Sequence, residues 1–261
     1  MSAWEAKKYL QYKLKAKNEH SIHSPFVFKL YLEAIKNKRK YSAFNELNKL
    51  RARLLRDKTV IEVTDLGAGS KKLKNRRAIA EIAKVSVVPK KYGELLFRLI
   101  NYFHSKSILE LGTSVGISVL YMYKAAPQAN IVSIEGCANT HTFAKNLIES
   151  NVRDGRGPIL VNSSFEIALE NDQTNKKYDL IYVDGNHTYE ATVKYFKLLL
   201  DKSHNDTVMI FDDIYWSPGM TKAWEEIKDH QQVTVTIDLF KLGLVFFRRE
   251  NKQKEHFCLR Y

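Results

Sequence analysis

Apolar and polar positions alternate in two different ways along the chain, and the change falls near residue 106. From residue 107 onward, short apolar runs alternate with longer segments whose apolar residues recur at helical spacing. The apolar runs predict strands near residues 107–111, 130–135, 158–162, 178–183, 206–211, 233–238 and 243–248. The intervening segments predict helices over residues 115–126, 138–150, 165–170, 187–202 and 218–230.

This regular alternation predicts an α/β fold. We expect a Rossmann-like sheet of seven mainly parallel strands with helices on both faces. Only Leu239–Leu242 separates the last two apolar runs, which predicts a closing hairpin and therefore an antiparallel last strand. Sheets of this kind bind ligands beyond the carboxyl ends of their strands, so the chemistry is expected there.

The first 90 residues are predicted to be a basic, mostly helical extension, followed by the α/β domain over residues 91–261. Predicted helices cover Trp4–Leu14, Phe26–Lys36 after Pro25 at a first helical position, Tyr41–Asp57, 78–85 and 92–103. Thr59–Ser70 resembles a nucleotide-binding turn, but the polar and basic segment 71–77 follows it. We interpret it as a loop or a short extended segment, with a substrate lid as the alternative.

The segment Ile108–Leu120 predicts a strand, a tight turn and a helix. Gly112 allows the chain to reverse, and Gly116 lets a ligand and a helix approach the backbone closely. The Gly-x-x-x-Gly spacing differs from that of dinucleotide sites and suits a nucleoside without phosphates, such as S-adenosylmethionine. Glu135 ends the second strand roughly 20 residues later, where Rossmann-type sites place the carboxylate that binds ribose. The alternative is a solvated acid at a strand end.

The ends of the later strands carry polar side chains. The third is followed by Asn162, Ser163 and Ser164, the fourth by Asp184 and His187, and the fifth by Asp212 and Asp213. Three converging carboxylates are suited to an octahedral Mg²⁺-like cation, and His187 titrates near neutral pH and could accept a proton. Alternatively, these residues cap loops and helices. Tyr215 and Trp216 are candidates for the wall of an acceptor pocket.

Composition limits the class of protein. The chain has 261 residues, 44% hydrophobic and 27% charged, which is typical of a globular protein with a full core. It contains two cysteines, too few for a disulfide framework, and lacks an apolar leader, so we expect a reducing cytoplasmic location. No run of about 18 apolar residues predicts a membrane span.

The net charge of +13 is unevenly distributed, because residues 1–106 carry +16 and residues 107–261 carry −3. Such asymmetry can mark an arm for nucleic acid or an anionic membrane. Trp4–Leu14 could be a basic amphipathic helix at a membrane surface. The alternative, which we favour, is a helix that packs its aromatic and leucine positions on the core and exposes its lysines.

Four motifs occur in order along the chain: ILELGTSVGISVL, SIEG, IYVDGNH and IFDDIYW. Together they resemble class I S-adenosylmethionine-dependent methyltransferases, and among these the catechol and caffeoyl-CoA type O-methyltransferases. The similarity covers roughly Tyr92–Arg249 and leaves the N-terminal region uncovered. The resemblance implies that residues 91–261 form a methyltransferase domain. Enzymes of this branch often dimerise, so the resemblance also implies a homodimer.

The resemblance implies roles for particular residues. It implies donor contacts from Glu110, Gly112, Thr113, Gly116, Ser118, Glu135, Ser164, Phe165 and Asp184, with Glu135 on the ribose and Ser164 and Phe165 bordering the adenine. It implies a metal held by Asp184, Asp212 and Asp213. Two positions depart from the family, because Asp213 stands where asparagine is usual and His187 where a catalytic lysine is common.

The sequence therefore predicts methyl transfer from S-adenosylmethionine to the hydroxyl of a small molecule. Deprotonation would come from a divalent cation or from His187. Two other classes stay open. One is a nucleic-acid methyltransferase that binds its substrate through the basic residues 1–106. Against it, the strand ending at Asp184 lacks the D/N-P-P-Y/F loop of many base methyltransferases. The other is a non-catalytic module that binds a membrane or a partner protein.

Overall fold

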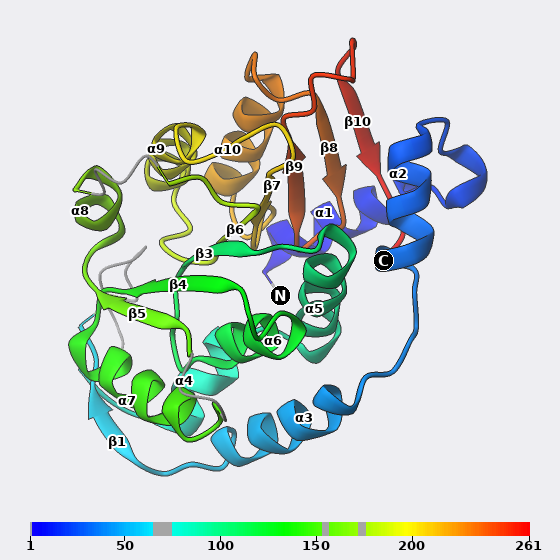
Figure 1. Ribbon diagram of the computed structural model, residues 1–261. Helices are drawn as coiled ribbons and strands as arrows, with labels where there is room; N and C mark the ends of the chain where they lie inside the picture. The colour runs from blue at the N-terminus through cyan, green and yellow to red at the C-terminus, as the bar shows by residue number, and fades with distance from the viewer. Residues whose placement is uncertain (1, 65–74, 153–156, 172–175) are drawn as a thin grey trace. The chain divides into compact units, whose positions relative to one another are not determined.

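The computed structural model describes residues 2–64, 75–152, 157–171 and 176–261 (Figure 1). The chain divides into two compact units. We call Asn37–Ala168 the central unit, and Met1–Lys36 together with Leu169–Tyr261 the terminal unit. This division by packing differs from the predicted boundary near residue 90, where the α/β domain was expected to begin; that boundary stays a prediction.

Three parallel strands form the centre of the central unit. β3 (Ser107–Leu111) pairs with β4 (Asn130–Glu135), which pairs with β5 (Ile159–Asn162). Helices follow each strand in turn, as α6 (Ile117–Ala125), α7 (Ala138–Glu149) and α8 (Phe165–Glu170). The register places Glu135 beside Asn162. The carboxyl ends of neighbouring strands thus lie together, where the sequence predicted ligand-binding residues.

The rest of the central unit packs around α6. α5 (Lys90–Phe103) lies so close to it that a Cβ added to Gly93 would be 2.5 Å from the Tyr121 ring. α3 (Ser42–Leu54) contributes Phe44, whose ring meets that of Phe97 edge to face at 5.0 Å. α4 (Ile79–Ser86) follows an antiparallel pair of short strands, β1 (Val60–Glu62) and β2 (Arg76–Ala78). The predicted extended segment is thus present at β1.

Five strands of the terminal unit pair in the order β10-β8-β9-β7-β6. Their bounds are β6 (Leu180–Val183), β7 (Val208–Phe211), β8 (Val235–Asp238), β9 (Gly243–Phe246) and β10 (Glu255–Cys258). β9 runs antiparallel to both β7 and β8, whereas β6 is parallel to β7 and β10 to β8. β8 therefore points the same way as β7, and the turn after β8 lies at the carboxyl edge of β7.

Helices complete the terminal unit. α9 (Tyr189–Leu200) and α10 (Pro218–Asp229) pack against each other (Figure 1). The N-terminal segment forms α1 (Ala3–Lys15), the short 3-10 helix η1 (Glu19–Ser21), α2 (Pro25–Leu30) and a π-helical turn, η2 (Tyr31–Ile35). A β-bridge between Lys17 and Leu259 joins the two chain ends.

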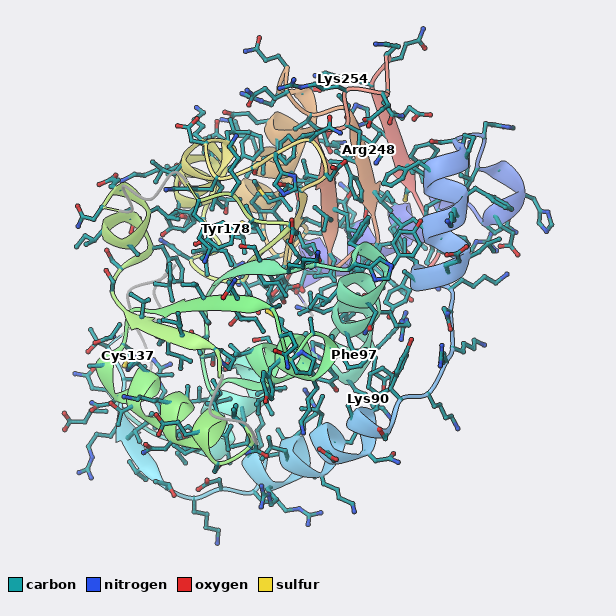
Figure 2. The ribbon with its side chains drawn as sticks, in the orientation of Figure 1. Lys90, Phe97, Cys137, Tyr178, Arg248 and Lys254 are labelled. Atoms are coloured by element: carbon teal, nitrogen blue, oxygen red, sulfur yellow. The ribbon has the colours of Figure 1, made fainter. Side chains whose placement is uncertain are left out.

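The predicted α/β class of mainly parallel strands with helices between them is confirmed. β10 was not predicted, because its four residues lie beyond a polar loop and show little apolar periodicity. Lys254, at that loop, donates to the carbonyl oxygens of Asp229 and His230 at the end of α10 (Figure 2). Residues 65–74, which include the second half of the lid candidate Thr59–Ser70, lie outside the described residues. No helix in the described part of the chain is long and apolar enough to cross a membrane.

Candidate functional site

The glycine turn after β3 has the backbone geometry that its sequence predicted. Gly112 and Gly116 have φ values of 108° and 86°, and Ser114 between them has φ 47°. The Gly112 amide donates to the Ile134 carbonyl at 3.0 Å, which ties the turn to β4. A Cβ added to Gly116 would lie 3.2 Å from Ile148 Cδ1, so this glycine lets α6 approach α7. The predicted close approach of a helix is confirmed, and that of a ligand stays a prediction.

Glu135 lies against this turn. Its Oε2 accepts a hydrogen bond from the Ser114 amide at 2.9 Å, and its Oε1 accepts one from the Cys137 amide at 2.9 Å. Burial raises the pKa of the Glu135 carboxyl above its usual range, and these amide hydrogen bonds oppose the shift. The carboxylate is thus oriented by the backbone beside the glycine turn, as a ribose-binding acid requires.

Glu110 is fully buried beneath the turn. Its Oε2 accepts from the Ser133 hydroxyl at 2.5 Å, and that hydroxyl lies 2.5 Å from Thr113 Oγ1. Thr113 and Ser118 are 1% and 6% exposed. Glu110 and Thr113 therefore support the turn from inside through Ser133, and Ser118 is buried; direct contact of these residues with a donor stays a prediction.

The segment after β5 is held next to Glu135. The Asn162 side-chain amide donates to the Glu135 carbonyl at 2.8 Å, and the Ser163 amide donates to the same oxygen at 3.2 Å. Ser164 Oγ accepts from the Ile167 amide at 3.3 Å at the start of α8, where Phe165 is the first helical residue. Ser164 and Phe165 thus follow directly on residues that contact the β4 end. This arrangement agrees with the predicted adenine border without testing it.

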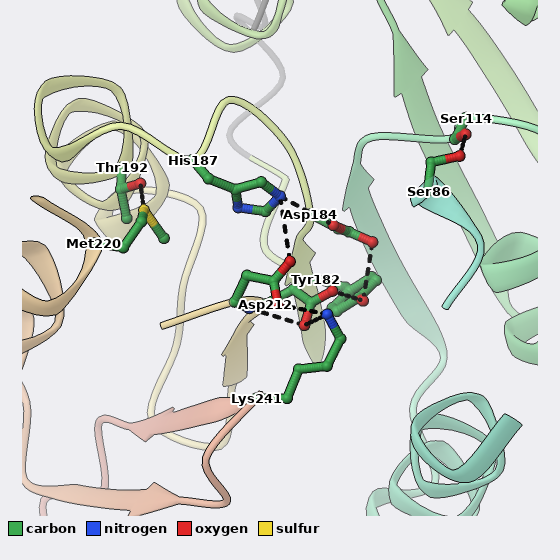
Figure 3. Close-up of polar contacts among 10 residues, drawn as sticks. Ser86, Ser114, Tyr182, Asp184, His187, Thr192, Asp212, Met220 and Lys241 are labelled. Atoms are coloured by element: carbon green, nitrogen blue, oxygen red, sulfur yellow. Dashed lines mark hydrogen bonds and ion pairs between the residues drawn. The ribbon is translucent and has the colours of Figure 1, made fainter. Parts of the chain in front are cut away.

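The three predicted acids of the terminal unit and the predicted His187 form a cluster with two further residues, Tyr182 and Lys241. We call Tyr182, Asp184, His187, Asp212, Asp213 and Lys241 the acidic cluster (Figure 3). The Tyr182 hydroxyl lies 3.1 Å from Asp184 Oδ2 and 3.3 Å from Asp212 Oδ2. His187 Nε2 lies 3.6 Å from Asp184 Oδ1 and 4.0 Å from Asp213 Oδ2. The side chains at the ends of β6 and β7 therefore lie close together, as the sequence predicted.

Lys241 was missed by the sequence analysis. Its Nζ lies 2.5 Å from Asp213 Oδ1 and 3.4 Å from Asp212 Oδ1 (Figure 3). It comes from the turn between β8 and β9, which the sequence analysis treated only as a connection. Tyr182 was missed as well, although the two-residue period of a strand places it on the same face as Asp184.

Burial and the three carboxylates set the protonation of this cluster. Burial, followed by the charges of Asp184 and Asp213, raises the pKa of Asp212 well above its usual range. Burial works to lower the pKa of His187, but the hydrogen bond and charge of Asp184 outweigh it and raise that pKa. Burial likewise opposes the charge of Lys241, and the neighbouring Asp212 and Asp213 carboxylates raise its pKa. Lys241 is therefore a cation at neutral pH.

The donor chemistry of the three carboxylates suits a hard divalent cation, but the ammonium of Lys241 contacts the oxygens of Asp212 and Asp213 that such an ion would use. Within the described ranges, no group of three or more His, Cys, Asp or Glu side chains is arranged to hold a metal ion. Metal ligation by Asp184, Asp212 and Asp213 stays a prediction, and it competes with Lys241 for the same atoms.

The predicted aromatic wall has two different members. Tyr215 stacks on Phe240 with ring centroids 5.7 Å apart and donates from its hydroxyl to Asp238 Oδ2 at 2.5 Å. Trp216, next to it, is 52% exposed. Tyr215 is therefore part of the packing behind the acidic cluster, and Trp216 is the one of the pair with surface to offer an acceptor.

Part of the chain matches a known family of proteins. Residues 109–214 match the family model described as a methyltransferase domain. This segment includes the glycine turn, Glu135 and the carboxylates of the acidic cluster. An uncharacterized protein of Acanthamoeba polyphaga mimivirus is 23% identical over 143 residues, which are 51% of this chain and 65% of that protein. The chain thus spans less than two thirds of the length of this relative.

Solved structures have the same fold at low sequence identity. An O-methyltransferase from Bacillus cereus in complex with SAH has a TM-score of 0.56 and 18% identity, covering 80% of this chain and 92% of that chain. SAH-bound methyltransferase PaMTH1 from Podospora anserina has a TM-score of 0.60 and 14% identity, covering 87% and 97%. The SAM complex of TomG from Streptomyces achromogenes has a TM-score of 0.53 and 17% identity, covering 85% and 95%.

Proposed function

We propose that the chain transfers a methyl group from S-adenosylmethionine to the hydroxyl of a small molecule, because residues 109–214 match the model of a methyltransferase domain. The observation that carries the proposal is the pairing of the glycine turn with Glu135, whose two carboxylate oxygens are fixed by the Ser114 and Cys137 amides. A carboxylate oriented in this way beside a positive-φ glycine turn is suited to the two hydroxyls of a ribose.

The donor would be held by residues of the central unit. Glu135 accepts from the ribose hydroxyls, and Gly112 and Gly116 leave the backbone of the turn open to the nucleoside. Glu110 fixes this turn from below through Ser133. Ser164 and Phe165 border the adenine.

The acceptor would be held at the acidic cluster. In the proposed step a bond forms between the acceptor oxygen and the methyl carbon while the carbon–sulfur bond breaks, and sulfur keeps the electron pair. His187 accepts the hydroxyl proton at Nε2, and Asp184 and Asp213 stabilise the resulting imidazolium at 3.6 and 4.0 Å. Alignment of the two reactants lowers the barrier of such a displacement, because it replaces a bimolecular encounter by a step within one complex.

Calorimetric titration of S-adenosylmethionine and S-adenosylhomocysteine tests the donor site. We expect micromolar binding to the wild type and a loss of about 10- to 100-fold in Glu135→Ala, because hydrogen bonds to a charged group are removed. Glu149→Ala in α7 is the control, since this carboxylate is 63% exposed. Absence of binding to the wild type would overturn the proposal, and an equal effect of both substitutions would remove Glu135 from the site.

A nucleic-acid acceptor is the second candidate. Lys49 and Arg53 of α3 and Arg56 just after it line one surface pocket within the basic residues 1–106, and such a set favours phosphate contacts. Strong binding of RNA or DNA that weakens steeply with salt would support it. The same basic residues could face an anionic membrane.

A further inference from the structure

Lys241 places an ammonium group where the carboxylates of the acidic cluster converge. Its side chain is 21% exposed, and that of Asp212 is 4% exposed. Charges withdrawn from water to this degree are costly unless they are paired. Because both side chains are largely buried, Lys241 and Asp212 need each other as partners. An ion pair between two solvated side chains, by contrast, contributes little to stability.

The remaining carboxylate oxygens of the cluster already have partners. Tyr182 lies beside one oxygen of Asp184 and one of Asp212, and His187 faces the other oxygen of Asp184. Asp212 Oδ1 also accepts from the Asp213 amide at 2.9 Å. A divalent cation would need these oxygens for its shell, and an ammonium within a few ångströms would repel it.

The turn that carries Lys241 is held in place by aromatic packing. Phe240 has φ 70°, and its ring meets those of Tyr9, Tyr12 and Tyr215 at centroid distances of 5.0, 5.5 and 5.7 Å. Its amide donates to Asp238 Oδ1 at 2.7 Å. A backbone conformation this rarely populated persists where its surroundings determine it. α1 therefore fixes the direction in which Lys241 leaves the turn.

We propose that the Lys241 ammonium is the resident cation of the acidic cluster, that it orients the acceptor oxygen there, and that methyl transfer by this protein needs no divalent cation. The inference rests on the proposed function, and the bonds made and broken are those given above. Lys241 keeps its proton throughout. It offsets the negative charge of Asp212 and Asp213. It also stabilises the negative charge that develops on the acceptor oxygen as His187 takes the hydroxyl proton.

Titration with Mn²⁺ tests the proposal without any methyl donor. We expect calorimetry to detect no Mn²⁺ binding to the wild type. Lys241→Met, which frees the carboxylates, should bind Mn²⁺ at least about tenfold more tightly than the wild type. Lys228→Met is the matched control, because Lys228 is also 21% exposed and lies 2.5 Å from Glu225, a carboxylate that does not belong to the cluster. This control should behave as the wild type.

Turnover measurements complete the test. Wild-type methyl transfer should be unchanged by a chelator, and Lys241→Met should lose turnover while its affinity for S-adenosylmethionine stays within about twofold of the wild type. One Mn²⁺ bound per wild-type chain, with binding lost in Asp212→Asn, would overturn the proposal. The wild-type titration decides the question even if Lys241→Met does not fold. Failure of the wild type to bind S-adenosylmethionine would instead refute the proposed function.

Discussion

Gly243 is the position where a single methyl group should have the largest structural effect near the acidic cluster. A Cβ built on this residue would lie 2.6 and 2.7 Å from Cζ3 and Cη2 of Trp224. Atoms on a rigid indole that is 1% exposed cannot rotate away as the end of a flexible side chain can. Gly243→Ala therefore forces either the indole of α10 or the backbone of β9 to move.

The cost follows from overpacking. Extra methyl groups in a well-packed core destabilise by about 1–3 kcal/mol, which for a chain of this size corresponds to a fall of roughly 2–12 °C in Tm. Gly219→Ala is the control in the same unit, since its added Cβ would meet its nearest atom at 3.5 Å, an ordinary contact. As a helical position, Gly219 should gain up to about 1 kcal/mol on substitution.

Gly243→Ala should lower methyl transfer as well as stability. Gly243 pairs with Phe211, which directly precedes Asp212, and it follows Lys241 by two residues. A shift of β9 therefore changes the distance between Lys241 and the carboxylates. We expect methyl transfer to fall at a temperature where the variant is fully folded. The affinity for S-adenosylmethionine should be retained, because the glycine turn and Glu135 belong to the central unit.

Thermal unfolding followed by circular dichroism measures the first effect. Trp224→Phe removes the ring atoms that the new methyl group meets, so the double variant should be less destabilised than the sum of the single variants, with a coupling of about 0.5–3 kcal/mol. A Gly243→Ala protein that melts with or above the Gly219→Ala control would refute the reasoning. Strict additivity with Trp224→Phe would show that another contact limits this position.

Three further outcomes are expected. The affinity for S-adenosylmethionine should fall as the pH is lowered through the raised pKa of Glu135, since only the ionised carboxylate accepts from both ribose hydroxyls, and calorimetry on Glu135→Gln should give a nearly flat profile. Tyr12→Phe should lower the free energy of unfolding by about 1–3 kcal/mol in chemical denaturation, because its buried hydroxyl bonds the main chain of residues 259–261 at 2.6 and 3.0 Å; Tyr9→Phe, at a residue that is 38% exposed, is the control. Gly116→Ala should cost about 1–2 kcal/mol by the same assay because its φ of 86° is unfavourable for alanine.

The sequence predicted most elements because their apolar residues recur with a clear period. β3, β4 and α8 match the predicted ranges residue for residue, and the two-strand closing hairpin is present at β8 and β9. The pairing of the glycine turn with Glu135 follows from the spacing of a strand–turn–helix unit. In each of these cases the physical cause is local, so one stretch of sequence contains it.

Lys241 could not be predicted in the same way. Its direction depends on the positive φ of Phe240 and on aromatic residues of α1 that lie more than 200 positions earlier in the chain. The topology did contain a signal. When a hairpin closes a parallel sheet, its first strand runs parallel to the others, so the turn between β8 and β9 lies at the carboxyl ends of the parallel strands. That rule places the turn near Asp212 but does not say which of its side chains faces the acids.

The packing of α1 changes the meaning of the basic N-terminal segment. Tyr12 is 4% exposed against Phe240, and the Lys8 ammonium lies over the rings of Trp4 and Tyr215 at 5.0 and 5.7 Å. The positive charge of Lys8 is therefore engaged in cation–π contacts within the terminal unit. Leu10 and Leu14, at 64% and 81% exposed, are the positions of α1 that packing does not explain. If the helix binds a membrane or a partner, these leucines rather than its aromatic residues must carry the contact.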